Sequence, residues 1–295
     1  MARVFLTGAT GLLGRSLLPR FLQAGHRVRA LARTPGATPD AEWIVGDLRN
    51  PSGYAAHLID TDILVHAAAV TGKATPALHD QVNREGTATL VEAATRAGVA
   101  RIIFISSIAA GFRDIKRYPY ALAKRAAEQC VRRSPISATI LRPTIIIGPG
   151  AGVLEGLRRL AALPVIPVFG PGRVLVQPIG VDDTARYVTH AVTAPDLDGL
   201  TCTIGGPDRV TLEDLLGRIH RRLRPSPPRF VHLPLGPILT ALGTVERIAY
   251  RAVPLTVGQL ATFRHDGIAD PNPLQDALAG SLTSLDELLK ESLAP

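Results

Sequence analysis

A tyrosine and a lysine four residues apart, Tyr120 and Lys124, form the pair in this sequence best suited to proton transfer. In a helix this spacing places the phenol and the ammonium on one face. A neighbouring cation stabilises a phenolate and lowers the tyrosine pKa from its usual value of about 10. The phenol could then exchange a proton with a substrate oxygen near neutral pH. Such pairs also arise by chance, so their surroundings must decide.

A glycine-rich turn near the start of the chain is the second chemical signal. Thr7 to Gly14 reads T-G-A-T-G-L-L-G, between a strand-like run and a helix-like run. Glycines there permit a tight turn and let backbone N–H groups approach a pyrophosphate at the helix N-terminus. The same glycines could serve the turn alone. We expect dinucleotide binding, with contacts from Gly8, Thr10, Gly11, Leu12, Leu13 and Gly14.

The end of the second strand-like run bears on the choice of dinucleotide. It reads Leu31-Ala32-Arg33, whereas an NAD site would place Asp or Glu there to bind the adenosine ribose. A guanidinium suits the additional 2′-phosphate of NADP. Arg33 could instead be a solvated strand-end residue. The sequence favours NADP(H) over NAD(H).

Alternating strand-like and helix-like runs must position these residues. Such alternation predicts right-handed crossovers and a doubly wound parallel sheet, an α/β fold of the Rossmann type. We expect a dinucleotide-binding domain over 1–150, with 174–204 returning to it, and a smaller C-terminal substrate lobe over 205–295. The expected strands are 4–6, 27–31, 43–45, 63–65, 101–105, 139–142, 174–179 and 200–204; the expected helices are 12–24, those starting near Asn83 and Tyr120, 212–223, 237–250 and 284–292.

The amino-acid composition limits the classes of protein to which the chain is expected to belong. The 295 residues are 46% hydrophobic and carry a net charge of +8, with basic clusters at 132–133, 158–159 and 221–224. The arginines are scattered and no aromatic platform accompanies them, so we expect solvated helix faces and no nucleic-acid partner. Cys130 and Cys202 indicate reduced thiols and no metal site. No signal peptide or spanning segment is recognised, which predicts a cytoplasmic monomer or homodimer without stable membrane insertion.

Further motifs along the chain make the sequence resemble the extended short-chain dehydrogenases/reductases, of the NAD-dependent epimerase/dehydratase type. The resemblance covers nearly the whole chain, and its motifs stand in the family's order. They are G-D-L at 46–48, V-H-A-A-A at 65–69, V-N-R-E-G-T at 82–87, the Tyr120/Lys124 pair, L-R-P-T at 141–144, G-P-G at 148–150, Q-P-I-G-V-D-D at 177–183 and I-G-G-P at 204–207.

The resemblance implies roles for individual residues. Ser107 would bind the substrate oxygen beside Tyr120, and Lys124 would also hold the nicotinamide ribose. His66 is expected to be a packed strand-end residue, and Asp182-Asp183 a helix start without metal. The cofactor contacts implied in this way are Asp47, Leu48, Ala67, Ala68, Ala69, Ser106, Tyr120, Lys124, Pro143, Thr144 and Ile145.

Three departures from the family's pattern limit the reactions that the protein is expected to catalyse. Ile108 follows Ser107 where sugar dehydratases carry an acid. Ile145 stands where many nucleotide-sugar enzymes have Asn, and only residues 108–119 separate Ser107 from Tyr120. Nucleotide-sugar epimerases and dehydratases are therefore disfavoured. Carbonyl/alcohol oxidation and reduction remains the leading enzyme hypothesis.

The C-terminal lobe supports a second hypothesis. Segments 237–256, 259–270 and 281–287 resemble a subgroup related to the nucleotide-binding accessory subunit of respiratory complex I. Many of its members bind NADPH without turnover. Two hypotheses therefore stand: an NADP(H)-dependent reductase or dehydrogenase acting on a hydrophobic small molecule, and a non-catalytic NADPH-binding structural or sensory protein.

Overall fold

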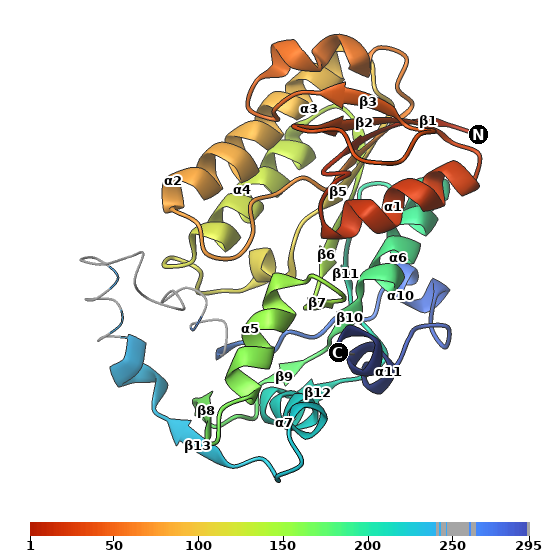
Figure 1. The fold of residues 1–295 in the computed structure, drawn as a ribbon. Helices are drawn as coiled ribbons and strands as arrows, with labels where there is room; N and C mark the ends of the chain where they lie inside the picture. The colour runs from red at the N-terminus through yellow and green to blue at the C-terminus, as the bar shows by residue number, and fades with distance from the viewer. Residues whose placement is uncertain (240–241, 243–245, 247–259, 261–263, 294–295) are drawn as a thin grey trace.

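A computed structural model of the chain describes residues 1–239, 242, 246, 260 and 264–293. Its centre is a seven-stranded sheet in the order β11-β6-β5-β4-β1-β2-β3, with every neighbouring pair parallel (Figure 1). The carboxyl ends of these strands meet at one edge of the sheet, as Thr7 beside His66 illustrates. This arrangement confirms the predicted Rossmann-type α/β fold.

The elements have the following bounds. The strands of the sheet are β1 (Arg3–Thr7), β2 (Arg27–Ala32), β3 (Glu42–Val45), β4 (Ile63–His66), β5 (Arg101–Ile105), β6 (Ser137–Pro143) and β11 (Thr201–Ile204). Short strands pair outside it: β7 (Ile146–Ile147) with β10 (Ile179–Gly180), β9 (Leu175–Val176) with β12 (Val210–Thr211), and β8 (Ile166–Phe169) with β13 (Phe230–Leu233). The α-helices are α1 (Leu12–Gln23), α2 (Pro76–His79), α3 (Gly86–Arg96), α4 (Pro119–Arg133), α5 (Gly152–Ala161), α6 (Val181–Thr193), α7 (Leu212–Leu223), α10 (Pro273–Ala277) and α11 (Leu285–Ser292).

Two layers of helices bury the sheet. Leu17 and Phe21 of α1 pack with Tyr187 and Val188 of α6 against one face. Helices α3 and α4 cover the other face, where Leu90 is fully buried. The strands are almost uniformly apolar because both faces are covered. The two layers hold the sheet rigidly, so that its carboxyl edge can present functional groups.

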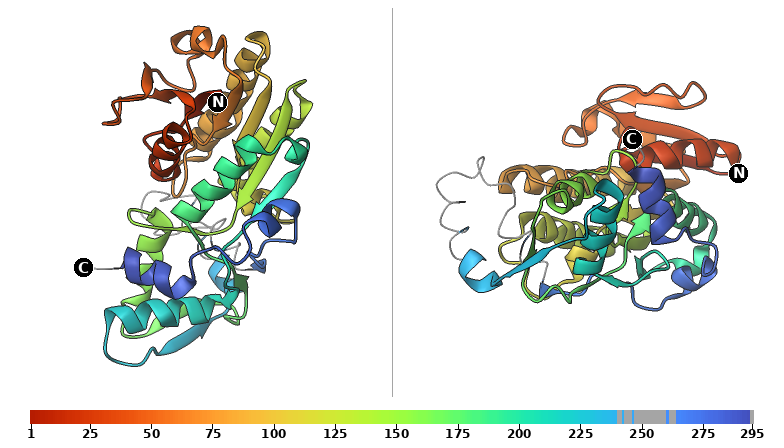
Figure 2. Two further views of the ribbon diagram at one scale, coloured as in Figure 1. Left: turned by 90° about the vertical axis from the view of Figure 1, so that its right-hand side faces the viewer. Right: turned by 60° about the horizontal axis from the view of Figure 1, so that its bottom comes forward.

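A smaller lobe has its own core. Leu154 and Leu157 of α5, Leu215 of α7 and Leu285 and Leu289 of α11 are buried together. Helices α7 and α11 lie side by side away from the main sheet (Figure 2). None of the helices in the described part of the chain has the length and apolar character needed to cross a bilayer.

Several expected elements differ from the observed ones. Of the segment 174–204, only β11 enters the main sheet; β9 and β10 pair with short strands outside it, while α6 packs on α1. The helix expected near Asn83 begins earlier, because Thr75 caps α2 through a hydrogen bond from Leu78 N–H. The expected helix 237–250 lies mostly outside the described residues. The proposed domain boundaries remain predictions.

Candidate active site

Two glycines in the turn between β1 and α1 are required by close backbone approach. Gly8 has a φ of +75°, and a Cβ atom there would lie 2.6 Å from the backbone nitrogen of Ala68. A Cβ atom on Gly14 would lie 2.0 Å from the carbonyl oxygen of Gly8. Neither contact is sterically possible, so any side chain at these positions would force the turn to move.

Gly11 differs from these two glycines. Its φ of −77° suits any residue, and a Cβ atom there would meet only the Gly8 oxygen, at 3.1 Å. Gly11 is the N-cap of α1, and no side chain caps this helix. The first helical N–H groups, beginning with Leu12 and Leu13, therefore have no intrahelical acceptor and can bind an anion. The turn has the form of a pyrophosphate site.

A buried row of hydrogen bonds fixes the neighbouring strand ends. Thr87 donates to the Asn83 carbonyl at 2.7 Å, so its oxygen accepts from Nε2 of His66 at 2.9 Å. Nδ1 of His66 then accepts from the Thr7 hydroxyl at 2.7 Å, and Thr7 accepts from the Ala68 N–H at 3.2 Å. The row holds the backbone after β4 against the glycine turn.

His66 is a structural residue, as expected from the sequence. It is 1% exposed. Burial, with a smaller contribution from the charge of Lys124, lowers the pKa of His66 to about 3. The imidazole is therefore neutral at physiological pH and cannot shuttle protons there.

A π-helix, η3 (Asp80–Glu85), interrupts the path from α2 to α3 and turns Asn83 inward. The Asn83 side chain accepts from the Val70 N–H at 2.8 Å and donates to the Val70 carbonyl at 2.9 Å. The Asn83 amide thus pairs with the backbone of Val70 in the way that a neighbouring strand would. This contact comes directly after Ala67, Ala68 and Ala69. Single π-turns of this kind occur frequently at functional sites.

Arg33 and Asp47 approach each other beyond the ends of β2 and β3. The Asp47 carboxylate binds Arg49, with Oδ2 2.7 Å from Nη2. Hydrogen bonding from Arg49 and, to a smaller extent, the charge of Arg33 lower the pKa of Asp47 to about 2. Arg33 is exposed and makes no ion pair within the described residues. A free guanidinium thus stands where the adenosine end of a dinucleotide is expected.

The structure brings Ser107, Tyr120 and Lys124 together at the end of β5. The Ser107 hydroxyl lies next to the Tyr120 phenol and acts to lower its pKa. Lys124 lies one turn further along α4, is 3% exposed, and donates from Nζ to the Ile105 carbonyl at 2.6 Å. Its ammonium also lies 4.7 Å from the ring centroid of Phe104.

The predicted lowering of the Tyr120 pKa by Lys124 is wrong for this structure. Burial raises the pKa of Tyr120, and the Ser107 hydroxyl offsets only part of that rise. Burial also lowers the pKa of Lys124 to about 7, although the charge of Glu128 opposes this. Lys124 therefore loses its proton more readily than an exposed lysine does.

Glu128 lies behind the site and binds side chains that surround it. It was not predicted from the sequence. It is fully buried and accepts from the Ser106 hydroxyl at 2.6 Å. Arg142 donates to it twice, at 2.8 and 2.6 Å, and Arg132 once, at 2.9 Å. These partners hold its pKa below the usual value although burial raises it. The side chain of Ser106, expected near the cofactor, is directed to this carboxylate instead.

The segment after β6 is fixed from both sides. Thr144 donates its hydroxyl to the Gln177 carbonyl, and its N–H to the Ile204 carbonyl at 3.0 Å. The carbonyl of Ile145 accepts from Ile179 N–H at 2.9 Å. Pro143, Thr144 and Ile145 therefore form a rigid strand-like edge. Leu48, expected near the adenine, packs its side chain into the core against Gly86.

Two aromatic contacts involve Tyr120 and the segment that precedes it. His79 lies edge-on to Tyr120, with ring centroids 5.7 Å apart. Phe112, in the short segment between Ser107 and Tyr120, stacks on His265 at 5.0 Å. Arg125 holds the Phe112 carbonyl, and Asp266 accepts from Leu175 N–H at 2.9 Å, so both sides of the stack are anchored. Because Phe112 and His265 lie far apart in the sequence, this contact could not be predicted from local patterns.

Known proteins similar to this chain agree with the fold. Residues 4–205 match the model of the NAD dependent epimerase/dehydratase family. A ceramide reductase of Caulobacter vibrioides is 35% identical over 251 residues, which span 82% of this chain and 77% of that protein. Subunit 9 of the NADH dehydrogenase [ubiquinone] 1 alpha subcomplex from Arabidopsis thaliana is 27% identical, over 91% of this chain and 68% of that protein.

A solved structure shows the same architecture across both parts of the chain. The crystal structure of gox2253 superposes with a TM-score of 0.79 and 25% sequence identity, covering 99% of this chain and 97% of that one. The family model covers more than half of the present sequence, and the match to the ceramide reductase extends well beyond it. The chain therefore belongs to the NAD dependent epimerase/dehydratase family, as an NAD(P)-dependent protein of the oxidoreductase and epimerase type with an extended short-chain dehydrogenase/reductase fold.

Proposed function

We propose that this protein is an NADP(H)-dependent oxidoreductase that interconverts a carbonyl and an alcohol on a hydrophobic small molecule. The observation that carries the proposal is the placement of the Ser107 hydroxyl next to the Tyr120 phenol, with the buried Lys124 one helical turn away. Two hydroxyl groups converge there on the space that a substrate oxygen would occupy. The bound dinucleotide would supply or accept the hydride.

The protein's own groups would manage the proton. In reduction, Ser107 orients the carbonyl oxygen, and Tyr120 donates its proton as the carbonyl carbon receives the hydride. A phenol with a raised pKa is protonated at neutral pH and so carries the proton to be donated. It becomes a stronger acid only if its surroundings stabilise the phenolate, as a charged Lys124 would. The developing phenolate would then draw Lys124 into its charged form, because the nearby negative charge raises the lysine pKa from about 7. Lys124 would also bind the nicotinamide ribose.

The preference for NADP(H) rests on Arg33. Its guanidinium has no ion-pair partner among the described residues, while Asp47, the nearest acid it influences, is already bound by Arg49. A 2′-phosphate would give Arg33 a charge-assisted, bidentate partner. Ala32 offers no carboxylate to a ribose hydroxyl.

The hydrophobic substrate class is supported by the groups around Tyr120. The rings of His79 and Tyr118 lie 5.7 and 5.8 Å from the Tyr120 ring, and Ile108 and Ile145 stand at positions where sugar-nucleotide enzymes carry polar groups. The relative from Caulobacter vibrioides is named for a lipid substrate. A ketone or aldehyde on an alkyl chain fits these surroundings.

A non-catalytic NADPH-binding role is the second candidate. The relative from Arabidopsis thaliana is named as a subunit of a respiratory assembly. The hydrogen bond from Lys124 to the Ile105 carbonyl would also serve a purely structural lysine. Epimerisation of nucleotide sugars is less well supported, because Ile145 cannot bind a phosphate.

Replacing one phenol tests the proposal. Tyr120→Phe should keep NADPH binding within about twofold and lower the turnover of long-chain ketones by the 10²–10⁴-fold typical of a lost general acid. Tyr118→Phe is the matched control, because this neighbouring ring lies 5.8 Å from Tyr120 and its phenol is not used in the mechanism. Equal inactivity of the wild type and Tyr120→Phe over a panel of ketones and quinones, with tight NADPH binding by both, would establish the non-catalytic role instead.

A further inference from the structure

The basic clusters at 158–159 and 221–224 have no part in the proposed chemistry, and the fold brings them together. His220 of α7 contacts the Ala161 carbonyl at the end of α5 through Nδ1 (2.7 Å) and the Ser226 carbonyl through Nε2 (3.1 Å). The N–H of Ile166 donates to the Arg229 carbonyl at 2.7 Å. We call the surface formed by residues 158–165 and 221–231 the lobe tip. It lies at the end of the molecule remote from β3 (Figure 1).

The lobe tip exposes apolar side chains close to one another. Leu163 is 42% exposed, Val165 47% and Val231 41%. Val165 directly precedes β8, and Val231 pairs with the second residue of that strand, Pro167. Prolines at 164, 225, 227 and 228 restrict the two loops. Isolated exposed apolar residues are ordinary, but three at the adjoining starts of β8 and β13 form a patch.

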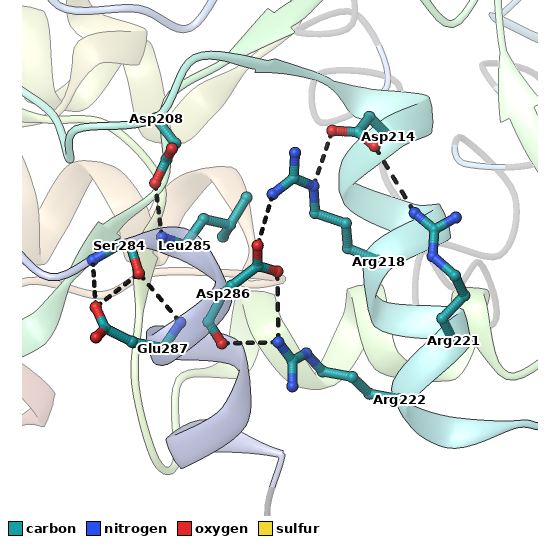
Figure 3. A network of polar contacts seen from close by, with 9 residues as sticks. All are labelled: Asp208, Asp214, Arg218, Arg221, Arg222, Ser284, Leu285, Asp286 and Glu287. Atoms are coloured by element: carbon teal, nitrogen blue, oxygen red, sulfur yellow. Dashed lines mark hydrogen bonds and ion pairs between the residues drawn. The ribbon is translucent and has the colours of Figure 1, made fainter.

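Positive charge surrounds this patch. Residues 217–231 contain five arginines and no acidic residue. Figure 3 shows how α7 and α11 use three of them: Arg218 and Arg222 bind Asp286, at 3.1 and 3.4 Å, and Arg221 lies 3.9 Å from Asp214. The two pairs with Asp286 attach α7 to α11, whereas the pair of Arg221 with Asp214 lies within α7. They account for the arginines within α7 as structural groups.

Two arginines of the lobe tip have no such role. Arg224 and Arg229 are exposed and have no ion-pair partner within the described ranges. Arg158 and Arg159 share a single acid, Glu155, at 2.7 and 2.9 Å. One of their two positive charges is therefore not balanced by this carboxylate. Basic residues in a last helical turn offset the helix dipole, but Arg224 and Arg229 lie beyond α7.

We propose that the lobe tip docks the protein on an anionic phospholipid surface. The arginines would meet the head groups while Leu163, Val165 and Val231 enter the boundary with the acyl chains. A nucleic acid or an acidic protein would engage the same arginines but would gain little from these three side chains. The inference goes beyond the proposed function, because it does not depend on which reaction the site performs.

Vesicle sedimentation of the full chain tests the proposal. The wild type should bind vesicles of phosphatidylcholine with phosphatidylglycerol, bind phosphatidylcholine alone weakly, and dissociate as salt rises. Arg224→Glu with Arg229→Glu should weaken partitioning by at least about 20-fold, since each arginine near the surface contributes roughly fivefold. Leu163→Ser with Val165→Ser should weaken it several-fold at unchanged charge.

Matched controls come from exposed residues of the dinucleotide-binding part. Arg27→Glu with Arg133→Glu makes the same change in net charge, and Val45→Ser with Ile59→Ser removes side chains that are 61% and 57% exposed. Both controls should bind vesicles as the wild type does. Unchanged thermal unfolding and NADPH affinity in every variant would show that the fold is intact.

Three results would overturn the proposal. The first is a wild type that does not sediment with anionic vesicles. The second is an equal loss of binding in the lobe-tip and control arginine variants. This would show that vesicle binding depends on the net charge of the protein and not on the lobe tip. The third is an unaltered Leu163→Ser/Val165→Ser variant together with equally tight binding to heparin or duplex DNA, which would assign the tip to acidic polymers.

Discussion

Gly11 and Gly14 should respond in opposite ways to the same substitution, although both belong to one glycine motif. A Cβ atom on Gly14 would lie 2.0 Å from the Gly8 oxygen and 2.6 Å from the Ala9 Cα. Ordinary contacts begin near 3.4 Å, so α1 and the turn would have to separate by about 1.4 Å, at a cost of about 1–3 kcal/mol or more. A Cβ atom on Gly11 requires a shift of only a few tenths of an ångström at one carbonyl oxygen.

For NADPH binding, in contrast to stability, Gly11 should be the more sensitive position. A side chain at Gly11 would stand in front of the open N-terminus of α1, where the pyrophosphate is expected. Gly11→Val should therefore weaken NADPH binding by at least the value of one charge-assisted hydrogen bond, about 1.5–3 kcal/mol. This corresponds to about 10- to 150-fold in Kd. Its stability should stay close to that of the wild type, because its φ of −77° suits valine.

Two measurements separate the positions. Urea unfolding of Gly11→Ala and Gly14→Ala compares their stabilities, and calorimetric titration of Gly11→Val with NADPH measures affinity. Folded Gly11→Val with wild-type affinity would refute the assignment of the pyrophosphate to this helix. Equal stability of Gly11→Ala and Gly14→Ala would refute the steric reasoning.

Three further predictions concern charged groups. Arg33→Ala should weaken NADPH binding by about 1.5–3 kcal/mol and leave NADH unchanged; equal losses for both cofactors in calorimetry would contradict this. Glu128→Gln should lower the unfolding free energy by about 1–3 kcal/mol, because it removes the buried carboxylate that accepts hydrogen bonds from the partly buried Arg142, whereas Arg132→Gln, at a site 44% exposed, should cost less than about 1 kcal/mol in urea unfolding. The folded pKa of Lys124, about 7, lies below its unfolded value of about 10.4. Between pH 7 and 9 the unfolded chain binds the proton that folded Lys124 lacks, so unfolding free energy should rise with pH more steeply in the wild type than in Lys124→Met.

Local sequence patterns were enough to predict the parts of the site that local structure builds. The β1–α1 turn, the strand ends near His66 and the pairing of Tyr120 with Lys124 each depend on residues close together in the chain. Glu128 lies four residues after Lys124, on the same face of α4, and this repeated spacing could have revealed it. Its partner Arg142 belongs to the L-R-P-T motif at 141–144, but nothing in that motif links it to Glu128.

Contacts between distant segments could not be predicted in this way. The stack of Phe112 on His265 joins residues 153 positions apart, and no periodicity connects them. The short strands β7 to β10 have two to four residues each, too few for an alternating pattern to appear. The pKa of Tyr120 was predicted in the wrong direction because spacing does not report burial.

The core of the small lobe has a consequence for synthesis of the chain on the ribosome. Leu154 and Leu157 of α5 are covered by Leu215 of α7 and finally by Leu285 and Leu289 of α11. At about 5–20 residues per second, roughly 6–25 s pass between the translation of α5 and that of α11. During this interval the apolar face of α5 is incompletely covered, whereas the sheet is complete as soon as α6 and β11 have been translated, more than 80 residues before α11 begins. A chaperone that acts on the nascent chain should therefore bind the lobe rather than the sheet.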